Sequence, residues 1–442
     1  MTDTIFALAS APGRAGVAVI RVSGPGAGAA LDGLAGLPRP APRLAALRRF
    51  RTAAGAVIDQ GLALWFPAPA SFTGEDCAEF HIHGGPAVVS AMADALVSAG
   101  LRPAEAGEFT RRAFEHGKMD LTEAEGLADL IDAETEGQRE QALAQMTGTL
   151  RTLYEDWREE LVSVLAALEG EIDFPDEDDV PDYLSATAGA PLASLAESLA
   201  AHLDDDRRGE RVRDGFAVAL IGAPNAGKSS LLNRLARREA AIVTDLPGTT
   251  RDVVEVRLVL GGFPVILADT AGLREAADRI EAEGVRRALA RAEDADLRLG
   301  VVDVSRETSH AVAERLRPGD ALILNKTDLV RPEDQGAPEG VRAFLVSAET
   351  GEGVDGLEAW LSETVAERLS RRDAPALSRA RHRRAVSVAA DAIAAARRRL
   401  ADAPELAAAE VQIAVRALES LTGRIDVEDV LDRVFSQFCI GK

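Results

Sequence analysis

The feature that most constrains this 442-residue chain is a glycine-rich turn between an apolar run and a helical pattern. Residues 216–221 form a short apolar run, which is typical of a buried parallel strand. The turn Gly222-Ala-Pro-Asn-Ala-Gly-Lys-Ser229 follows, and Ser230-Leu-Leu-Asn-Arg-Leu235 opens a helix. Strand, glycine-rich turn and helix in this order predict a phosphate-binding loop. A single match leaves open a plain turn with an exposed lysine.

Three further segments follow at predicted strand ends or loops. They are the pair Thr249-Thr250, Asp269-Thr-Ala-Gly272 after the apolar run 264–268, and Asn325-Lys-Thr-Asp328 after the run 321–324. Four such segments in one order indicate a guanine-nucleotide site on a doubly wound parallel sheet. Ser347-Ala348-Glu349 is a weaker fifth segment, because Ser-Ala is common in any loop.

Each segment offers a different contact. Lys228 is expected to reach the β- and γ-phosphates, and Ser229 to give its hydroxyl to Mg²⁺. Asp269 can hold Mg²⁺ through water, while the Gly272 N–H can meet the γ-phosphate. Asp328 can accept hydrogen bonds from the ring N–H and the amine of guanine. Adenine does not offer this arrangement, so a buried carboxylate would lose its partners.

The residue after Gly272 is Leu273, where Ras-like GTPases carry the glutamine that orients the attacking water. Leucine cannot orient water, so hydrolysis must recruit another group or be very slow. Glu281, on the predicted helix 275–295, is the candidate, since a carboxylate can position water. Spacing alone does not separate it from Glu275, Asp278 and Glu283 of the same helix.

A positive charge for the transition state is also missing from the four segments. The loop 244–249, with the amide oxygen of Asn225, can cage a monovalent cation beside the phosphates, because oxygen ligands suit a hard cation. Arg251 and Arg274 are the alternatives within the protein. Either arrangement would supply the positive charge that an arginine finger places beside the transition state in other GTPases.

Composition limits the remaining possibilities. The chain has room for about three domains, and 47% hydrophobic residues are typical of a globular protein. Two cysteines, Cys77 and Cys439, are too few for a disulfide framework. There is no signal-peptide pattern and no apolar run long enough to span a bilayer, so we expect a soluble cytoplasmic protein.

The net charge of −22 argues against indiscriminate binding of nucleic acid. A local exception is the arginine-rich stretch 371–399, while acidic residues gather at 169–179. Such blocks are either solvated faces or interaction surfaces. Sequence alone gives the two interpretations of the arginine stretch equal weight.

The pattern along the chain predicts an α/β plus all-α protein. Residues 1–117 are mixed α+β, 118–211 are mainly helical, 212–370 alternate strands and helices, and 371–442 are helical again. The simplest organisation is a helical domain in two parts, interrupted by an inserted Ras-like P-loop GTPase domain with a doubly wound parallel sheet. Insertion is tolerated because domain termini tend to lie close together.

The two ends of the chain narrow the family. Pro12-Gly-Arg-Ala-Gly-Val-Ala-Val-Ile-Arg-Val-Ser-Gly24, Ser71-Phe-Thr-Gly-Glu-Asp76, His83-Gly-Gly85, Glu108-Phe-Thr-Arg-Arg-Ala-Phe114 and Phe438-Cys-Ile-Gly-Lys442 carry the resemblance. With the nucleotide segments, they make the chain resemble, over its full length, the MnmE (TrmE) family of bacterial tRNA uridine-modification GTPases.

The resemblance implies a chemistry and its partners. The N-terminal domain is expected to bind 5-formyl- or methylene-tetrahydrofolate and to form a homodimer. A flavin-dependent partner, MnmG (GidA), is expected to complete a heterotetramer. Together they would add an aminomethyl or carboxymethylaminomethyl group to carbon-5 of the tRNA wobble uridine, with a folate one-carbon unit as the source and GTP hydrolysis driving a conformational cycle.

The resemblance also assigns residues. Glu281 matches the family's water-orienting glutamate, Ser229 and Thr250 match the Mg²⁺ ligands, and Asn225, Thr244, Leu246 and Thr249 match a potassium cage. Arg21, Glu79, Lys118 and Lys442 match folate contacts, and Cys439 is a candidate reactive thiol. The implied GTP contacts are Asn225, Ala226, Gly227, Lys228, Ser229, Ser230, Thr244, Asp245, Leu246, Pro247, Gly248, Thr249, Thr250, Asp269, Thr270, Ala271, Gly272, Asn325, Lys326, Asp328, Ser347, Ala348 and Glu349.

Other interpretations stay open at this point. Without the resemblance, Arg21 is a strand-edge charge, Glu79 an ordinary ion-pair partner and Lys118 a cation at the start of a helix. Leu246-Pro247 departs from the Ile-Ala common in the family's cation loop, which puts the rigidity of that loop in doubt. A ribosome-assembly GTPase without modification chemistry is the alternative function. A folate-dependent aminomethyltransferase with a regulatory GTPase insert is the third.

Overall fold

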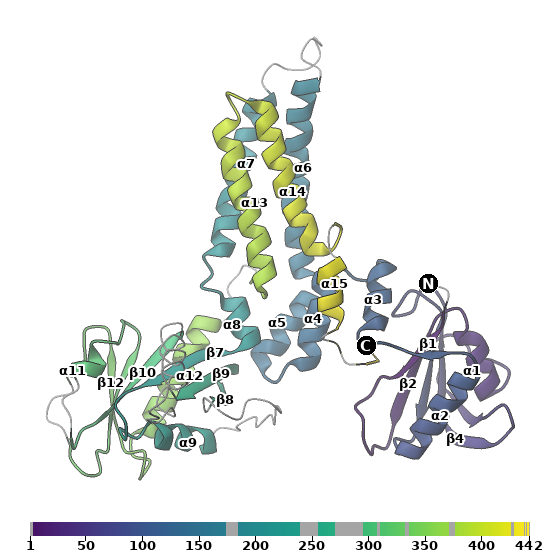
Figure 1. Ribbon diagram of the computed structural model, residues 1–442, viewed down its shortest axis with the longest axis horizontal. Coiled ribbons are helices and arrows are strands. Elements are labelled where there is room, and N and C mark those ends of the chain that lie inside the picture. Colours follow the sequence, from purple (N-terminus) through teal and green to yellow (C-terminus); the bar gives the residue numbers. More distant parts are fainter. Residues whose placement is uncertain are drawn as a thin grey trace, which may run out of the picture. The chain divides into compact units, whose positions relative to one another are not determined.

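The computed structural model describes residues 3–173, 184–238, 255–269, 295–306, 310–331, 336–370, 376–425, 428–436, 438 and 440–441 (Figure 1). The chain divides into two compact units. The first comprises Met1–Ala128, Gln145–Ala188 and Ala395–Lys442, and the second comprises Asp129–Ala144 and Gly189–Ala394. The two units divide both predicted helical segments, 118–211 and 371–442, between them, and the four predicted boundaries remain a prediction.

The first unit contains a six-stranded sheet formed by residues 5–103 of the described chain. Its order is β3-β4-β5-β2-β1-β6, and neighbours are antiparallel except for β1 and β6. Its elements are β1 (Ile5–Leu8), β2 (Ala18–Ser23), α1 (Ala27–Ala35), β3 (Ala46–Arg51), β4 (Val57–Phe66), β5 (Cys77–Ile82), α2 (Pro86–Ser98) and β6 (Arg102–Pro103). The predicted mixed α+β character of this region is confirmed.

Alternation along these strands decides which face is buried. On β2, Ile20 and Val22 are buried, while Arg21 between them points to the other face. The buried side joins α1 and α2 in one apolar cluster, through residues such as Leu31 and Leu96, and both helices are seen against the sheet in Figure 1. The opposite face is therefore left to polar side chains such as Arg21.

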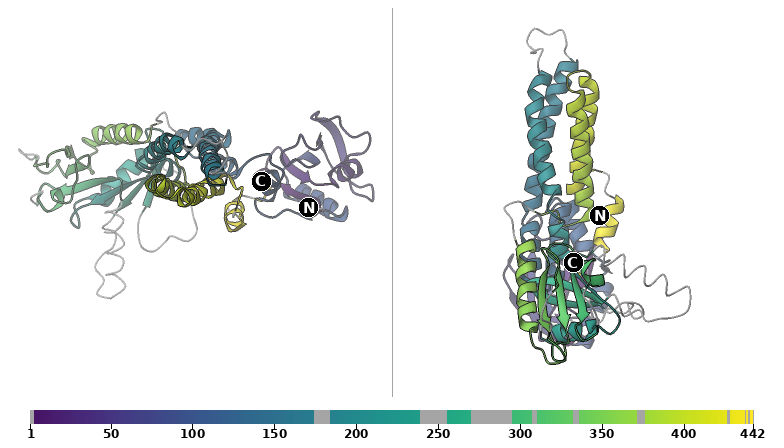
Figure 2. Two further views of the ribbon diagram at one scale, coloured as in Figure 1. Left: turned by 90° about the horizontal axis from the view of Figure 1, so that it is seen from above. Right: turned by 90° about the vertical axis from the view of Figure 1, so that its left-hand side faces the viewer.

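Helices make up the rest of the first unit. The long helices α6 (Thr149–Asp173) and α14 (Pro404–Thr422) lie side by side, linked by a 2.8 Å ion pair between Arg158 and Glu419 (Figure 2). Shorter helices are α3 (Glu108–Glu115), α4 (Leu121–Asp132), whose last residues fall in the second unit, and α15 (Glu428–Phe435). Phe435 and Phe438 pack against Leu121, which fixes the end of the chain to the start of α4.

The second unit contains the sheet that carries the nucleotide segments. Its described strands are β7 (Phe216–Ile221), β8 (Glu255–Leu260), β9 (Phe263–Asp269), β10 (Leu297–Asp303), β11 (Ala321–Asn325) and β12 (Arg342–Val346), in the order β12-β11-β10-β7-β9-β8. All neighbours are parallel except β8, which runs antiparallel along the edge beside β9. The predicted parallel sheet is confirmed, with this antiparallel edge as an addition.

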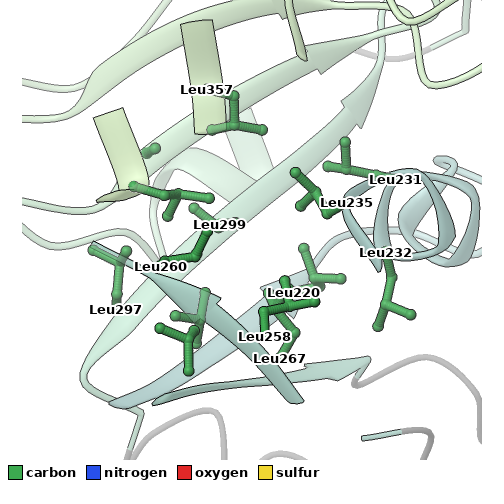
Figure 3. Close-up of a cluster of buried hydrophobic side chains, with 14 of the residues drawn as sticks. Leu220, Leu231, Leu232, Leu235, Leu258, Leu260, Leu267, Leu297, Leu299 and Leu357 are labelled. Atoms are coloured by element: carbon green, nitrogen blue, oxygen red, sulfur yellow. The ribbon is translucent and has the colours of Figure 1, made fainter. Parts of the chain in front are cut away.

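Alternate side chains of each strand enter different layers. Leu220 of β7 joins a leucine-rich cluster with α9 (Lys228–Arg238) and α12 (Val354–Leu369), shown in Figure 3. Its neighbours Ala219 and Ile221 face the other way, toward Leu316 after α11 (His310–Ala313). Helices therefore cover both faces of the sheet, as a doubly wound fold requires.

The other helices among the described residues of the second unit are α5 (Glu136–Met146, to residue 144), α7 (Leu184–Leu203, from residue 189), α8 (Arg208–Asp214) and α13 (Ala380–Arg399, to residue 394). Helix α5 is attached to the sheet region by hydrogen bonds of 2.9 Å from Gln138 Nε2 to the Arg213 carbonyl and from the Gly137 N–H to the Gly262 carbonyl. Within the described residues, no helix combines the length and hydrophobicity needed to cross a membrane.

Candidate functional site

The glycine-rich turn joins β7, in the interior of the second sheet, to α9. Asn225 adopts a left-handed conformation (φ 65°), and so does Gly227 (φ 96°). A Cβ at Gly227 would lie 2.1 Å from Asn325 Nδ2, so only glycine fits there. The turn therefore needs its glycine for close packing as well as for backbone shape.

Lys228, the first residue of α9, is held inside this turn. Its Nζ donates to the carbonyl oxygens of Gly222 and Ala223, at 2.7 Å each, and the residue is 3% exposed. Ser229 and Ser230 follow on the exposed side of the helix start. An ammonium group, hydroxyls and the N-terminus of α9 thus meet in one place, which suits an anion and a metal ion bound to it.

Asn325, at the end of β11, links three segments that are far apart in the sequence. Its Nδ2 donates to the Ala226 carbonyl at 2.8 Å, and its Oδ1 accepts from the Ala348 N–H at 3.0 Å. The side chain is 1% exposed. The phosphate loop, the Asn-Lys-Thr-Asp segment and the Ser-Ala-Glu segment are therefore fastened together by one buried amide.

Asp328 is anchored next to this junction. Its Oδ1 accepts a hydrogen bond of 2.6 Å from Ser347 Oγ, and Ser347 is fully buried. Asp328 itself is exposed. One carboxylate oxygen is thereby fixed by the protein, which sets the orientation in which the other can meet a ligand.

Lys326 and Asp303 form an ion pair beside the same loops, with 2.5 Å between Nζ and Oδ2. Burial alone would raise the pKa of Asp303, but hydrogen bonds from Lys326 and Ser305 outweigh it and lower the pKa below the usual aspartate value. Lys326 is a predicted contact of the nucleotide, whereas its partner Asp303 is not marked by any motif. Asp303 ends β10 opposite Asn325, a pairing that only the strand register reveals.

All these segments leave the sheet at one edge, because the strands that precede them are parallel. Asp269 is the last residue of β9 and pairs with Leu220 of β7, so its backbone lies at this edge too. The order of strands reverses beside β7, where open α/β sheets bind ligands. The predicted contacts outside the described residues are Thr244, Asp245, Leu246, Pro247, Gly248, Thr249, Thr250, Thr270, Ala271, Gly272 and Glu281, with the alternatives Arg251 and Arg274.

A second candidate site is a cavity of about 560 Å³ in the first unit. Arg21 and Glu79 lie directly opposite each other on β2 and β5, with Arg21 Nε 3.1 Å from Glu79 Oε1. Glu79 Oε2 is also 3.1 Å from His81 Nε2, and the Arg21 guanidinium lies 5.3 Å from the centre of the Phe72 ring. The lining residues are Arg21, Arg43, Phe66, Ala70, Ser71, Phe72, Cys77, Glu79 and Lys118.

Three of the four predicted folate contacts therefore line one cavity, while Lys442 and Cys439 lie outside the described residues. Carboxylate, aromatic and cationic side chains together suit a flat heteroaromatic ligand with an acidic tail. Arg43, Phe66 and Phe72 also line the cavity, although none of them was predicted as a contact. Phe72 lies in the segment 71–76 that carries the family resemblance, but no motif marks Arg43 or Phe66, because the cavity forms only when β2, β5 and two loops come together.

A buried ion cluster supports the loop that forms this cavity. Arg112 of α3 is fully buried and pairs with Asp3 (2.9 Å), Glu75 (3.0 Å) and Glu108 (2.9 Å). Glu75 belongs to the loop between β4 and β5 and also accepts a 2.7 Å hydrogen bond from Ser23. The loop is thus tied to α3 and to the start of the chain.

The arginine-rich stretch 371–399 is partly neutralised in the second unit. Arg379 pairs with Asp129 at 2.7 Å, and Arg383 pairs with Asp205 at 2.6 Å and with Glu210 at 3.2 Å. Residues 371–375 lie outside the described residues. These pairs use part of the basic charge for internal contacts.

Two family models match the chain. The model described as GTP-binding protein TrmE N-terminus matches residues 4–118, and the model described as MnmE helical domain matches residues 121–439. Together they extend from the first strand to the last turn of the chain.

Known relatives match over the full length. A tRNA modification GTPase MnmE of Maricaulis maris is 65% identical over 443 residues, covering 100% of both chains. One of Parvibaculum lavamentivorans is 57% identical over 445 residues, again covering 100% of both. Among solved structures, the G domain of the T. maritima FeoB iron transporter matches 35% of this chain and 98% of its own, at 27% identity and a TM-score of 0.27. A score this low supports no inference about this chain.

Proposed function

This chain belongs to the MnmE family of tRNA modification GTPases, and on that premise we propose that its GTP hydrolysis drives modification of carbon-5 of the tRNA wobble uridine. The observation that carries the proposal is the meeting of three nucleotide segments at Asn325, at the carboxyl edge of the sheet. An aminomethyl or carboxymethylaminomethyl group would be added together with the flavin-dependent partner MnmG (GidA).

The nucleotide site divides the work among its residues. Lys228 would neutralise the β- and γ-phosphates, Ser229 and Thr250 would hold Mg²⁺, and Asp328 would recognise guanine. The remaining predicted GTP contacts would complete the nucleotide site. Because Leu273 cannot orient water, Glu281 takes that part. Glu281→Ala should therefore abolish hydrolysis and leave GTP affinity unchanged, whereas a parallel fall in affinity would contradict the assignment.

The proposed monovalent-cation site combines Asn225 of the phosphate loop with oxygen donors of the loop 244–249, and this donor set would suit potassium. Asn225 is exposed in a left-handed turn, and its amide oxygen would join oxygens of Thr244, Leu246 and Thr249 around the ion. The ion would supply positive charge beside the phosphates. GTP turnover should be faster in potassium than in sodium chloride, since sodium is too small for the cage, and equal rates would contradict this proposal.

The cavity of the first unit is the proposed folate site. Its chemistry fits, because Glu79 can accept from the amine edge of a pterin while Arg21 and Lys118, with Lys442, can pair with carboxylates. Bound folate would supply the one-carbon unit. We propose the boundaries 1–117, 118–211, 212–370 and 371–442 for the folate-binding, first helical, GTPase and second helical segments, with homodimerisation through the first and a heterotetramer with the flavoprotein. Cys439 is proposed as a reactive thiol.

Mass analysis of tRNA nucleosides from a deletion strain tests the function. We expect the carbon-5 aminomethyl and carboxymethylaminomethyl uridines to disappear, and to return when the wild-type gene is supplied but not with Glu281→Ala. An unchanged nucleoside profile together with defective ribosomal subunits would contradict the proposal and support a role in ribosome assembly.

A further inference from the structure

Three cationic side chains line the cavity, and Arg43 and Lys118 differ from Arg21 in their hydrogen-bond partners. Lys118 Nζ donates to the Pro69 carbonyl at 3.0 Å, and Arg43 Nη2 donates to the carbonyl of the next residue, Ala70. The Arg43 guanidinium also lies 5.7 Å from the centre of the Phe66 ring. The two side chains therefore converge on consecutive residues of one loop from separate parts of the chain.

Their charges are not balanced by the protein. Arg21 has Glu79 at 3.0 Å, but Arg43 and Lys118 make no ion pair with any described residue. Glu79 is already shared between Arg21 and His81. Although the chain has a net charge of −22, two positive charges of the cavity wall are thus not neutralised by a carboxylate of the described residues, because Glu79 already pairs with Arg21 and His81.

Arg43 and Lys118 can exchange a hydrogen bond to a neutral carbonyl for a stronger one to a carboxylate of a ligand. Both side chains are exposed and donate to neutral carbonyl oxygens. Charge-assisted hydrogen bonds to carboxylates are roughly twice as strong as neutral ones. A ligand with several carboxylates would therefore gain from each of the two groups without disrupting an existing ion pair.

We propose that Arg43 and Lys118 form a clamp for the γ-linked oligoglutamate tail of a folate, so that the chain prefers polyglutamylated to monoglutamylated folate. This inference rests on the proposed folate function of the cavity. A tail with one glutamate offers two carboxylates close together, whereas each further glutamate adds one carboxylate along an extended chain. Arg43 is thus a specificity-determining residue that no sequence motif assigned.

Calorimetric titration of the full-length protein with 5-formyl-tetrahydrofolate carrying one or three glutamates tests the clamp. At about 0.05 M salt we expect the triglutamate to bind roughly tenfold more tightly, and we expect the preference to shrink at about 0.5 M salt. Arg43→Gln and Lys118→Gln should each reduce it, and the double variant should remove it.

Arg49→Gln is the matched control, because Arg49 is an exposed arginine on β3 that does not line the cavity. It should keep the full preference. Equal binding of the two folates by the wild type, or a preference that survives in the double variant, would overturn the clamp alone. Failure of the wild type to bind either folate would overturn the clamp together with the proposed folate function.

Discussion

The nucleotide loops and the N-terminal cavity are built in opposite ways. The nucleotide loops each occupy a few consecutive residues after a strand, and one buried residue, Asn325, fastens them together. The cavity draws single residues from positions between 21 and 118 and depends on a buried ion cluster behind its loop. A site made of contiguous loops can be recognised from local motifs, whereas a site made of scattered side chains needs a family resemblance or the fold itself to be recognised.

The largest expected effect is on the cavity side. Arg112→Met would leave Asp3, Glu75 and Glu108 without their shared partner, and breaking a buried ion pair costs about 3–5 kcal/mol. Hydrogen exchange should show lost protection in peptides of the first sheet and of α3, with protection of β7 and β11 retained.

Arg111→Met is the matched control, since Arg111 is next in sequence but its side chain is 40% exposed and pairs at the surface. Its cost should be at most about 1 kcal/mol. Equal protection in the Arg112 and Arg111 variants would show that the buried cluster does not support the cavity.

On the nucleotide side, Lys228→Ala removes the ammonium held in the turn. We expect GTP affinity to fall about 100-fold, or about 2.7 kcal/mol, measured by fluorescence titration with a labelled nucleotide. Arg237→Ala, an exposed position on the same helix, should bind GTP as the wild type does. Unchanged affinity in the Lys228 variant would contradict the predicted phosphate loop.

Asn325→Ala tests how the nucleotide loops are joined. It would leave the Ala226 carbonyl and the Ala348 N–H without their buried partner, at a cost of about 2 kcal/mol. The exposed Asn233 on α9 provides a control, where alanine should change stability by less than about 0.5 kcal/mol. If urea unfolding gave both variants the same midpoint, Asn325 would not be the junction.

The smallest effect is a difference in acid sensitivity. The Arg102 hydrogen bond lowers the pKa of Asp3, and the pKa of Glu108 is lowered because hydrogen bonds from Arg102, the Glu105 N–H and Arg112 outweigh its burial. A carboxylate whose pKa is lowered on folding stabilises the folded state at pH values above its unfolded pKa, which is 3.8 for Asp3 and 4.5 for Glu108. This stabilisation is lost as the pH falls through the lower pKa of the folded state.

The pKa of Asp296, the residue before β10, is shifted in the opposite direction, because burial raises it despite hydrogen bonds from the Ala217 N–H and Arg211. Its protonation on acidification favours the folded state. The lowered pKa of Asp303 at the end of β10 acts against this effect, so the two aspartates of the second sheet oppose each other, whereas Asp3 and Glu108 of the first unit both add acid sensitivity. Below about pH 4.5 the first sheet should therefore lose protection before the second, measured by hydrogen exchange corrected for intrinsic rates. Loss in the reverse order would contradict this electrostatic contrast.

Much of the fold was accessible from the sequence. The strand predictions 216–221 and 321–324 match β7 and β11, and α13 lies within the stretch 371–442 that is predicted to be helical. These succeed because apolar periodicity and breaker residues act locally. The antiparallel edge strand β8 was not predicted, because strand direction is set by the partner strand rather than by local pattern.

The residues of the two candidate sites also differ in whether local sequence patterns predict them. Lys228, Asn325 and Asp328 lie in motifs whose spacing reflects backbone geometry. Arg43 could not be recognised from the sequence. It matters because no carboxylate of the described residues pairs with it, and ion pairing depends on residues that are distant in the chain. Arg21 and Glu79 were identified by family resemblance, and their 3.0 Å pairing follows from strand register.

The central claim is that one chain carries two separately constructed binding sites. Calorimetric titration of GDP and of 5-formyl-tetrahydrofolate into the wild type, Lys228→Ala and Arg21→Gln tests it most directly. We predict that the wild type binds both ligands, that Lys228→Ala loses GDP but keeps folate, and that Arg21→Gln loses folate but keeps GDP. A wild type that binds only one ligand, or variants that each lose both, would contradict the account.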